Sequence, residues 1–194
     1  MMKQPEFTPF SITVRGRLVT FRRPAVMGIL NITADSFYDG GRYRDADAVL
    51  AQARRLLAEG ADIIDVGAAS SRPGAALPPP EVEAQRLKEA VGLIRSELPE
   101  AILSVDTCYS LPARTAVEAG ADMVNDIGGG QFDEQMFPTV AEMQVPYILM
   151  HNRALPEVMQ QMTGYDDIVA DLTRYFSERL DALYRLGVKD VWID

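Results

Sequence analysis

AILSVDTCYSLPARTAVEAGADMVND, residues 101–126, contains one complete structural repeat of this chain. An apolar run ends in Asp106, a segment with helical periodicity follows from Pro112 to Ala119, and a second apolar run ends in Asn125 and Asp126. Gly120 stands between helix and second run, where helices commonly end. Near-continuous apolar strands joined by crossover helices are typical of a parallel sheet covered on its outer face. The stretch therefore predicts a strand–helix–strand unit of an α/β fold.

The same unit recurs along the rest of the chain. The predicted strands are residues 25–31, 61–67, 101–106, 121–126, 145–150 and 189–194. The predicted helices lie near Asp45–Glu59, Pro80–Leu98, Pro112–Ala119, Asp133–Met143 and Tyr165–Leu186. Ahead of them, FSITVRGRLVTF (residues 10–21) alternates apolar and polar residues on both sides of Arg15-Gly16-Arg17, a pattern that predicts a β-hairpin. We therefore expect a hairpin cap at residues 1–23 and the main fold at residues 24–194.

Two closures of the sheet compete, an eight-stranded barrel and an open doubly wound sheet. Asn31, Asp106, Asn125 and Asp194 each end a different predicted strand, and the carboxyl ends of the strands are where a (β/α)₈ barrel gathers its catalytic groups. An open sheet would concentrate such residues near one switch point. The sequence therefore favours an α/β TIM barrel, (β/α)₈, that is incomplete here because about six strands do not close it. We expect a chain truncated before the last part of the barrel.

Composition limits the possible partners and location. With 19 basic and 28 acidic residues the net charge is −9, which disfavours binding to nucleic acid or to an anionic membrane surface. The single cysteine, Cys108, cannot form an internal disulfide, and no stretch approaches the roughly 18 apolar residues of a membrane span. The N-terminus also lacks the apolar run of a signal peptide. We expect a cytoplasmic protein that binds neither nucleic acid nor membrane.

Two loops that follow predicted strands carry most of the candidate chemistry. MGILNITADSFYDGG (residues 27–41) and DVGAASSRPGA (residues 65–75) each run from an apolar strand into polar and small residues. Residue by residue, ordinary explanations suffice, because Asn and Asp commonly cap turns. As strings they resemble the two signatures of the dihydropteroate synthases, Met-Gly-Ile-Leu-Asn-Val-Thr-Pro-Asp-Ser-Phe-Ser-Asp-Gly-Gly and Gly-Gly-Glu-Ser-Thr-Arg-Pro-Gly. Ala34 replaces the proline of the first, and Ala68 and Ala69 depart from the second.

Three further segments fit the same family in the correct order. SVDT (104–107) and VNDI (124–127) end two strands with an acid or an amide, a pair that matches the donors and acceptors of a pterin ring. YILMHN (147–152) resembles the family's Met-His-Met segment, and VWID (191–194) resembles the start of its Asp-Pro-Gly-Phe-Gly-Phe motif. A lone histidine after an apolar strand is more often structural than catalytic, so His151 receives no role.

The resemblance implies a reaction in which p-aminobenzoate displaces pyrophosphate from 6-hydroxymethyl-7,8-dihydropterin pyrophosphate to give 7,8-dihydropteroate in folate biosynthesis. It implies Asn31 as a ligand of Mg²⁺ and Asp35 as the residue that organises the metal and the developing cation; these two are the catalytic candidates. The implied pterin contacts are Asp106, Asn125, Ile127, Met150 and Asp194. The resemblance also implies a p-aminobenzoate pocket, which sulfonamides would occupy as well. Its implied residues are Phe37, Ser71, Arg72 and Pro73. The full-length protein is expected to be a homodimer.

Three alternatives remain open. The family's Ser-Arg-Lys segment and its last-strand Arg and His are missing, so we expect the 194-residue chain by itself to be inactive. It would then be a non-catalytic pterin-binding fragment, or a purely structural barrel fragment that binds nothing. A methyltetrahydrofolate methyltransferase type of barrel would share the pterin residues but needs no pyrophosphate-binding loops.

Overall fold

A six-stranded parallel sheet forms the centre of the computed structural model, which describes residues 7–32, 42–68, 78–154, 158 and 161–194. Its strands are β3 (Met27–Asn31), β4 (Ile63–Gly67), β5 (Ile102–Asp106), β6 (Met123–Asp126), β7 (Tyr147–Leu149) and β8 (Val191–Ile193). Each strand pairs with the next one in chain order. A doubly wound sheet reverses its strand order at the switch point, whereas a (β/α)₈ barrel does not. The order therefore confirms the barrel type and makes the doubly wound alternative wrong.

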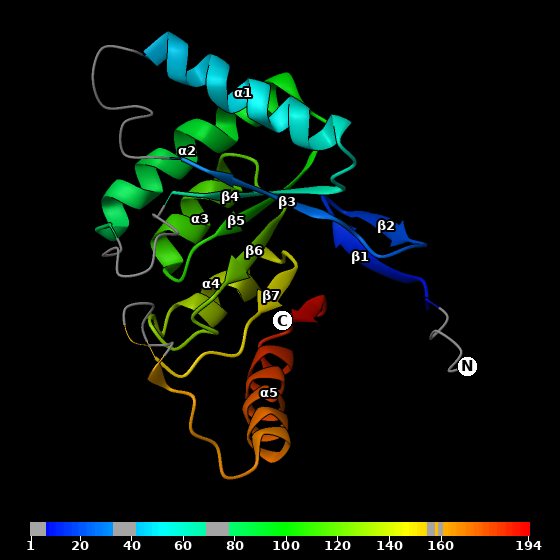
Figure 1. Cartoon of the computed structure of the whole chain (residues 1–194), viewed down its shortest axis with the longest axis vertical. Coiled ribbons are helices and arrows are strands. Elements are labelled where there is room, and N and C mark those ends of the chain that lie inside the picture. The colour runs from blue at the N-terminus through cyan, green and yellow to red at the C-terminus, as the bar shows by residue number, and fades with distance from the viewer. Residues whose placement is uncertain (1–6, 33–41, 69–77, 155–157, 159–160) are drawn as a thin grey trace.

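Helices connect the strands on the outer side of the sheet (Figure 1). They are α1 (Arg42–Ala58), α2 (Pro80–Glu97), α3 (Ser110–Glu118), α4 (Met136–Met143) and α5 (Ile168–Arg185). None of these described helices is both long enough and apolar enough to span a bilayer. Gly120 follows α3 as expected, with φ of 116°, and a Cβ there would lie 2.9 Å from Arg95 Cγ. Only glycine meets both constraints without strain.

Two helices begin three residues later than the sequence predicted. The Asp167 side chain accepts hydrogen bonds from the backbone N–H groups of Val169 and Ala170, so α5 starts at Ile168. Before α4, the Asp133 carboxylate accepts from the backbone N–H of Gln135 and from both the N–H and the hydroxyl of Ser110. Asp133 therefore ties the start of α3 to the turn before α4 and is not itself helical.

The predicted hairpin consists of β1 (Phe10–Val14) and β2 (Arg17–Phe21), paired antiparallel. Arg15 and Gly16 form its turn with φ of 49° and 72°, as the tight turns of two-residue hairpins require. The hairpin and the sheet share a buried apolar cluster. The hairpin contributes Ile12, Val14 and Phe21, and the sheet strands contribute Ile63, Met123 and Ile148. The hairpin thus covers the amino end of the sheet. A domain boundary at residue 23 stays a prediction.

Side chains alternate between the two faces of each strand. Along β4, Ile64 and Val66 belong to the large apolar cluster that packs against the helices, whereas Ile63 packs against the hairpin on the inner face. Asp65 and Gly67 follow Ile63 on that inner face. Apolar residues thus close the amino end, and polar residues line the inner face toward the carboxyl end.

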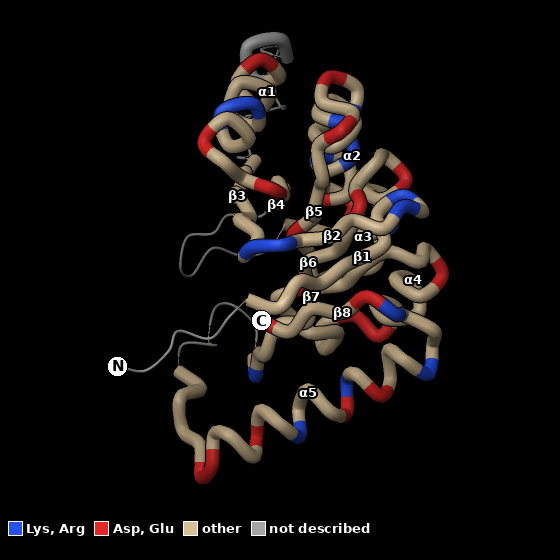
Figure 2. Tube along the Cα trace, turned by 90° about the vertical axis from the view of Figure 1, so that its right-hand side faces the viewer, with Lys and Arg blue, Asp and Glu red and all other residues tan. Residues whose placement is uncertain are grey.

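An ion-pair network ties the hairpin to the amino end of the sheet. Asp122 is fully buried, and its carboxylate lies 2.7 Å from Arg95 Nη2 and 3.1 Å from Arg15 Nε. It also accepts a hydrogen bond of 2.8 Å from the backbone N–H of Leu103. Along α5, by contrast, basic and acidic residues alternate (Figure 2), and its ion pair between Asp181 and Arg185 is exposed. Asp122 is therefore the charged group on which this end of the fold most depends.

We predict that Asp122→Ala lowers the free energy of unfolding by about 3 kcal/mol, because the largely buried Arg95 would lose its charge partner. Arg15 contributes less, since 44% of its side chain is exposed. Urea unfolding measures the change, provided that the free energy of unfolding depends on urea concentration with the same slope in both proteins. Glu97→Ala, which breaks an exposed pair with Arg54, is the control and should cost less than about 1 kcal/mol. Equal losses in the two variants would contradict this account.

Candidate functional site

Three of the predicted site residues lie at one level of the sheet. The parallel register aligns Asn31 of β3 with Gly67 of β4, Gly67 with Asp106 of β5, and Asp106 with Asn125 of β6. Because strands in register present aligned residues on the same face, their side chains share the inner face of the barrel. The structure therefore brings Asn31, Asp106 and Asn125 together at the carboxyl end of four adjacent strands.

Gly67 makes room for this arrangement. A Cβ at Gly67 would lie 2.9 Å from Asn31 Oδ1 and 3.4 Å from Asp106 Oδ2. Any larger residue would therefore push these oxygens away. The sequence gives Gly67 as the last residue of an apolar strand, and its function as a gap between two polar side chains emerges only from the register.

Asp65, which sequence reasoning did not select, lies one step deeper on the same face. Its Oδ2 accepts a 2.9 Å hydrogen bond from Asn125 Nδ2, which orients the Asn125 amide. Burial raises the pKa of Asp65, and the Ser104 hydroxyl and the Asn125 amide partly offset that rise. Neither Asp65 Oδ1 nor Ser104 Oγ has a hydrogen bond of normal geometry. The sequence feature that could have identified Asp65 is an acidic residue in the middle of an apolar strand.

Acidic groups are concentrated around this level. Burial, and then the charges of Asp65, Glu83 and Asp126, raise the pKa of Asp106 to about 7. Glu83 on α2 is 2% exposed; burial raises its pKa to about 7 against the opposing hydrogen bond of Thr107. Sequence reasoning missed Glu83, because acids in the first turn of a helix usually face solvent.

The loop after β6 is organised by Asp126, on the opposite face of the strand from Asn125. Tyr147 donates a 2.5 Å hydrogen bond to Asp126 Oδ2, and the backbone N–H groups of Gly128 and Gly130 donate to the same carboxylate at 2.7 and 2.8 Å. All of these contacts are buried or partly buried. The carboxylate therefore fixes the path of the chain that follows Asn125 and contains Ile127.

Backbone hydrogen bonds join the carboxyl ends of β7 and β8. Asp194 N donates to Leu149 O, and His151 N donates to Asp194 O, each at 3.0 Å. Met150 and Asp194, both predicted contacts, thus lie on neighbouring segments. The His151 ring packs edge-on against Tyr175 at 4.6 Å, and burial together with Arg153 and Arg179 lowers its pKa. These contacts favour a structural role for His151.

The other predicted residues lie outside the described residues. They are Asp35, Phe37, Ser71, Arg72 and Pro73. Within the part of the chain that the structure describes, no group of three or more His, Cys, Asp or Glu side chains is placed to hold a metal ion. The described residues therefore supply the floor of the candidate site, and its two loops remain predictions.

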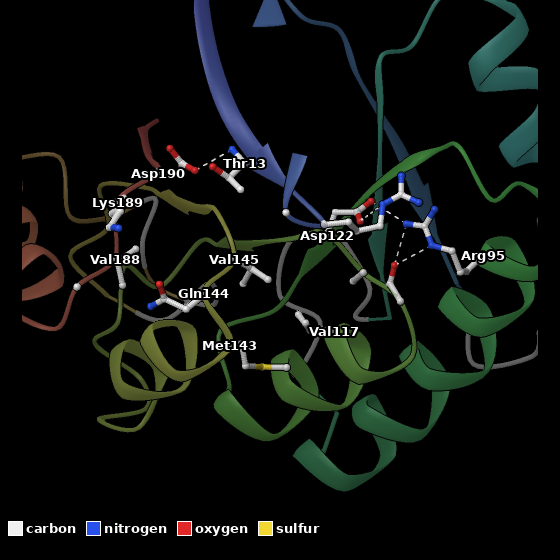
Figure 3. Close-up of a pocket in the computed structure, with 15 residues that line it drawn as sticks. Thr13, Arg95, Val117, Asp122, Met143, Gln144, Val145, Val188, Lys189 and Asp190 are labelled. Atoms are coloured by element: carbon white, nitrogen blue, oxygen red, sulfur yellow. Dashed lines mark hydrogen bonds and ion pairs between the residues drawn. The ribbon is translucent and has the colours of Figure 1, made fainter. Parts of the chain in front are cut away.

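A cavity of about 630 Å³ lies at the opposite end of the sheet (Figure 3). Its walls include the hairpin residue Thr13, the Arg95–Asp122 pair, and Lys189 ahead of β8. Asp190 there accepts a hydrogen bond from the Thr13 backbone N–H. The amino end of a (β/α)₈ barrel usually serves stability, and catalytic groups gather at the other end. We attribute this cavity to the way in which the hairpin packs against the amino end of the sheet, and we assign it no catalytic role.

A parallel barrel sheet with carboxylate and carboxamide groups at its carboxyl end defines the class of enzyme to which the chain is related. The pattern of the family described as "Pterin binding enzyme" matches residues 27–194, and the chain belongs to that family. Within it, the chain is 40% identical to the dihydropteroate synthase of Synechocystis over 167 residues, which cover 86% of this chain and 57% of the relative.

Two solved structures have the same fold. The dihydropteroate synthase of Xanthomonas albilineans with 4-aminobenzoic acid is 37% identical, with a TM-score of 0.82 over 96% of this chain and 66% of the other. That of Yersinia pestis with a sulfonamide drug is 34% identical, with a TM-score of 0.82 over 95% and 67%. This chain thus spans between about half and two thirds of the length of these relatives.

We predict that the free energy of unfolding falls as pH rises from about 4 to about 7. The ordinary pKa values of Asp106 and Glu83, 3.8 and 4.5, apply to the unfolded chain, whereas folding raises both to about 7. The folded state then holds more protons across this range, so stability is present below pH 4 and is lost as pH rises through 7.

Urea unfolding at several pH values tests this directly. Asp106→Asn and Glu83→Gln should each flatten the pH dependence, because each variant removes one buried titration. Asp181→Asn is the control, since Asp181 lies in an exposed pair with Arg185 on α5. Curves that stay parallel to that of the parent chain in all three variants would rule out the buried acids as the cause.

Proposed function

We propose that a protein containing this chain forms 7,8-dihydropteroate. The observation that carries the proposal is the level formed by Asn31, Asp106 and Asn125 on the barrel of a pterin-binding enzyme. In the proposed reaction the C–O bond at the exocyclic methylene of the pterin breaks, and pyrophosphate leaves with the electron pair. A C–N bond then forms to the amine of p-aminobenzoate, which loses a proton.

The described residues suit recognition of the pterin ring. Its ring N–H and amino groups require acceptors, and its carbonyl and ring nitrogen require donors. Asp106 and Asp194 would accept, while Asn125 offers both, with its amide oriented by Asp65. Ile127 and Met150 would pack against the flat faces. A buried site that hydrogen-bonds a ring strongly rejects analogues that leave its polar groups unpaired.

Mg²⁺ fits the chemistry of the site. Asn31 places an amide oxygen, a hard ligand of the kind that Mg²⁺ prefers, beside Asp106 across the Gly67 gap. Mg²⁺ commonly uses only one or two protein ligands besides water and phosphate oxygens, so a single described ligand is sufficient. When bound, the ion would neutralise charge that develops on the departing pyrophosphate. Asp35 is proposed to act beside Asn31.

The p-aminobenzoate pocket is assigned to the two loops. Phe37 would form one wall, and Ser71, Arg72 and Pro73 would help to form the rest of the pocket, in which the arginine fork is well suited to a carboxylate. The similarity to a synthase solved with 4-aminobenzoic acid supports this assignment.

The proposed activity belongs to the whole protein. Relatives contain a further region without a counterpart in these 194 residues, and by resemblance it supplies a lysine for the pterin and an arginine and histidine for the pyrophosphate. We therefore infer that turnover requires that region and that the chain alone binds pterin without catalysis. A homodimer and a cytoplasmic location stay predictions.

Pterin binding by this chain is the first test. Calorimetric titration with 6-hydroxymethylpterin should show binding, and Asp106→Ala should weaken it about tenfold or more, because an unpaired ring donor costs about 1–3 kcal/mol. Asp181→Ala, far from the site on α5, should bind like the parent chain. In the longer protein, Asp106→Ala should abolish most dihydropteroate formation. Unchanged affinity and turnover in that variant would remove Asp106 from the site.

Sulfonamide competition tests the loops. In the longer protein, a sulfonamide should compete with p-aminobenzoate, and Phe37→Leu or Pro73→Ser should raise its inhibition constant more than the KM for p-aminobenzoate. The reason is that the drug resembles the substrate but does not fill the pocket identically. Parallel increases for drug and substrate across both variants would show that these residues do not distinguish the two.

A further inference from the structure

One hydroxyl from helix α5 joins the loops that follow β6 and β7. Tyr175 donates a 3.0 Å hydrogen bond to the carbonyl oxygen of Met150. The same hydroxyl lies 3.4 Å from the backbone N–H of Asn152 and 3.3 Å from Gln131 Nε2, both donors. Met150 and Asn152 follow β7, and Gln131 follows β6. A single side chain on an outer helix thus contacts both loops.

The two loops also bind each other beside Tyr175. Asn152 Nδ2 donates to the carbonyl oxygen of Ile127 at 2.9 Å. Gln131 Nε2 donates to the carbonyl oxygens of Asn152 and Gly128 at 2.7 and 3.0 Å. These hydrogen bonds form a continuous network from Ile127 to Met150 that passes through the Tyr175 hydroxyl.

Arg179, one helical turn along α5, fixes the Tyr175 ring. Its guanidinium lies 3.5 Å from the ring centre, and its Nε donates to the carbonyl oxygen of Gly129 at 3.1 Å. Burial raises the pKa of Tyr175, so the hydroxyl keeps its proton and remains a donor to Met150. The helix therefore holds the loop after β6 through Arg179 and the loop after β7 through Tyr175.

The two loops are tightly packed against each other where Tyr175 contacts them. At Gly129, which has φ of 57°, a Cβ would lie 2.1 Å from the Tyr175 hydroxyl and 2.7 Å from Met150 O. The backbone of one loop is therefore packed directly against the other loop and against Tyr175. Such packing restricts the relative placement of the two loops.

The strand pairing ends one residue before this contact. The register between β6 and β7 ends at the pair Asp126 and Leu149. Ile127 and Met150 directly follow the ends of these two strands, and the nearest hydrogen bond between the strands, from Met150 N to Asp126 O, is long at 3.5 Å. Their separation therefore depends on the last strand pair and also on contacts beyond it, which include the Tyr175 network.

We propose that Tyr175 is a positioning residue that sets the distance between Ile127 and Met150 and thereby the width of the pterin pocket. The inference rests on the proposed function, which makes these two residues pterin contacts. Tyr175 acts through the backbone carbonyl of Met150 and the Asn152 amide, without touching the ligand.

The test compares Tyr175→Phe, which removes one oxygen and keeps the ring, with Tyr184→Phe on the exposed side of the same helix. Without ligand, Tyr175→Phe should shift the NMR signals of the Ile127 and Met150 methyl groups and speed amide exchange at Asn152 about tenfold. With 6-hydroxymethylpterin, its Kd should rise about tenfold. Tyr184→Phe should match the parent chain in all three measurements.

Asp122→Ala serves as the second control, because it should lower stability at the far end of the sheet and leave pterin affinity unchanged. If Tyr175→Phe lowers only the melting temperature, with methyl signals and Kd as in the parent chain, Tyr175 is merely structural and the inference is wrong. If the parent chain binds no pterin, the proposal that this chain alone binds the pterin fails, and the methyl signals and Asn152 exchange still decide whether Tyr175 places the two loops.

Discussion

The parallel register of β3 to β6 is the constraint on which the rest of the site depends. It places Asn31, Gly67, Asp106 and Asn125 at one level, each contributed by a different strand. A slip of one residue in any strand would turn its polar residue to the outer face and an apolar residue inward. The helices outside the sheet oppose such a slip because they bury the residues that alternate with the polar ones, and the hairpin opposes it because it buries apolar residues nearer the amino end of the same inner face.

The two ends of the sheet have different electrostatic roles. At the amino end, Asp122 is paired with Arg95 and Arg15, so a buried charge holds the hairpin in place. At the carboxyl end, Asp65, Asp106 and Glu83 have raised pKa values, mainly because burial disfavours their charged forms. Keeping these acids buried reduces the stability of the protein wherever they are charged.

Residues outside the recognised motifs complete the site. Asp126 and Tyr147 shape the loop after β6 from the core side, while Tyr175 and Arg179 hold it from α5. Helix α5 belongs to the unit that follows β7, yet its side chains contact the loops of two strands. The outer layer of the barrel therefore contributes to the geometry of the inner face as well as to the core.

The sequence by itself determined the elements, the barrel type and the identity of the polar residues at the strand ends. These follow from local rules: apolar runs form strands, Gly120 ends a helix, and the motif strings at Met27 and Asp65 carry the family resemblance. Only the tertiary structure showed that Gly67 is a gap between Asn31 and Asp106, that Asp65 orients Asn125, and that Tyr175 joins two loops. Each of these depends on distances between strands or helices far apart in the chain, and such distances are set by register and packing, which no local pattern of residues encodes.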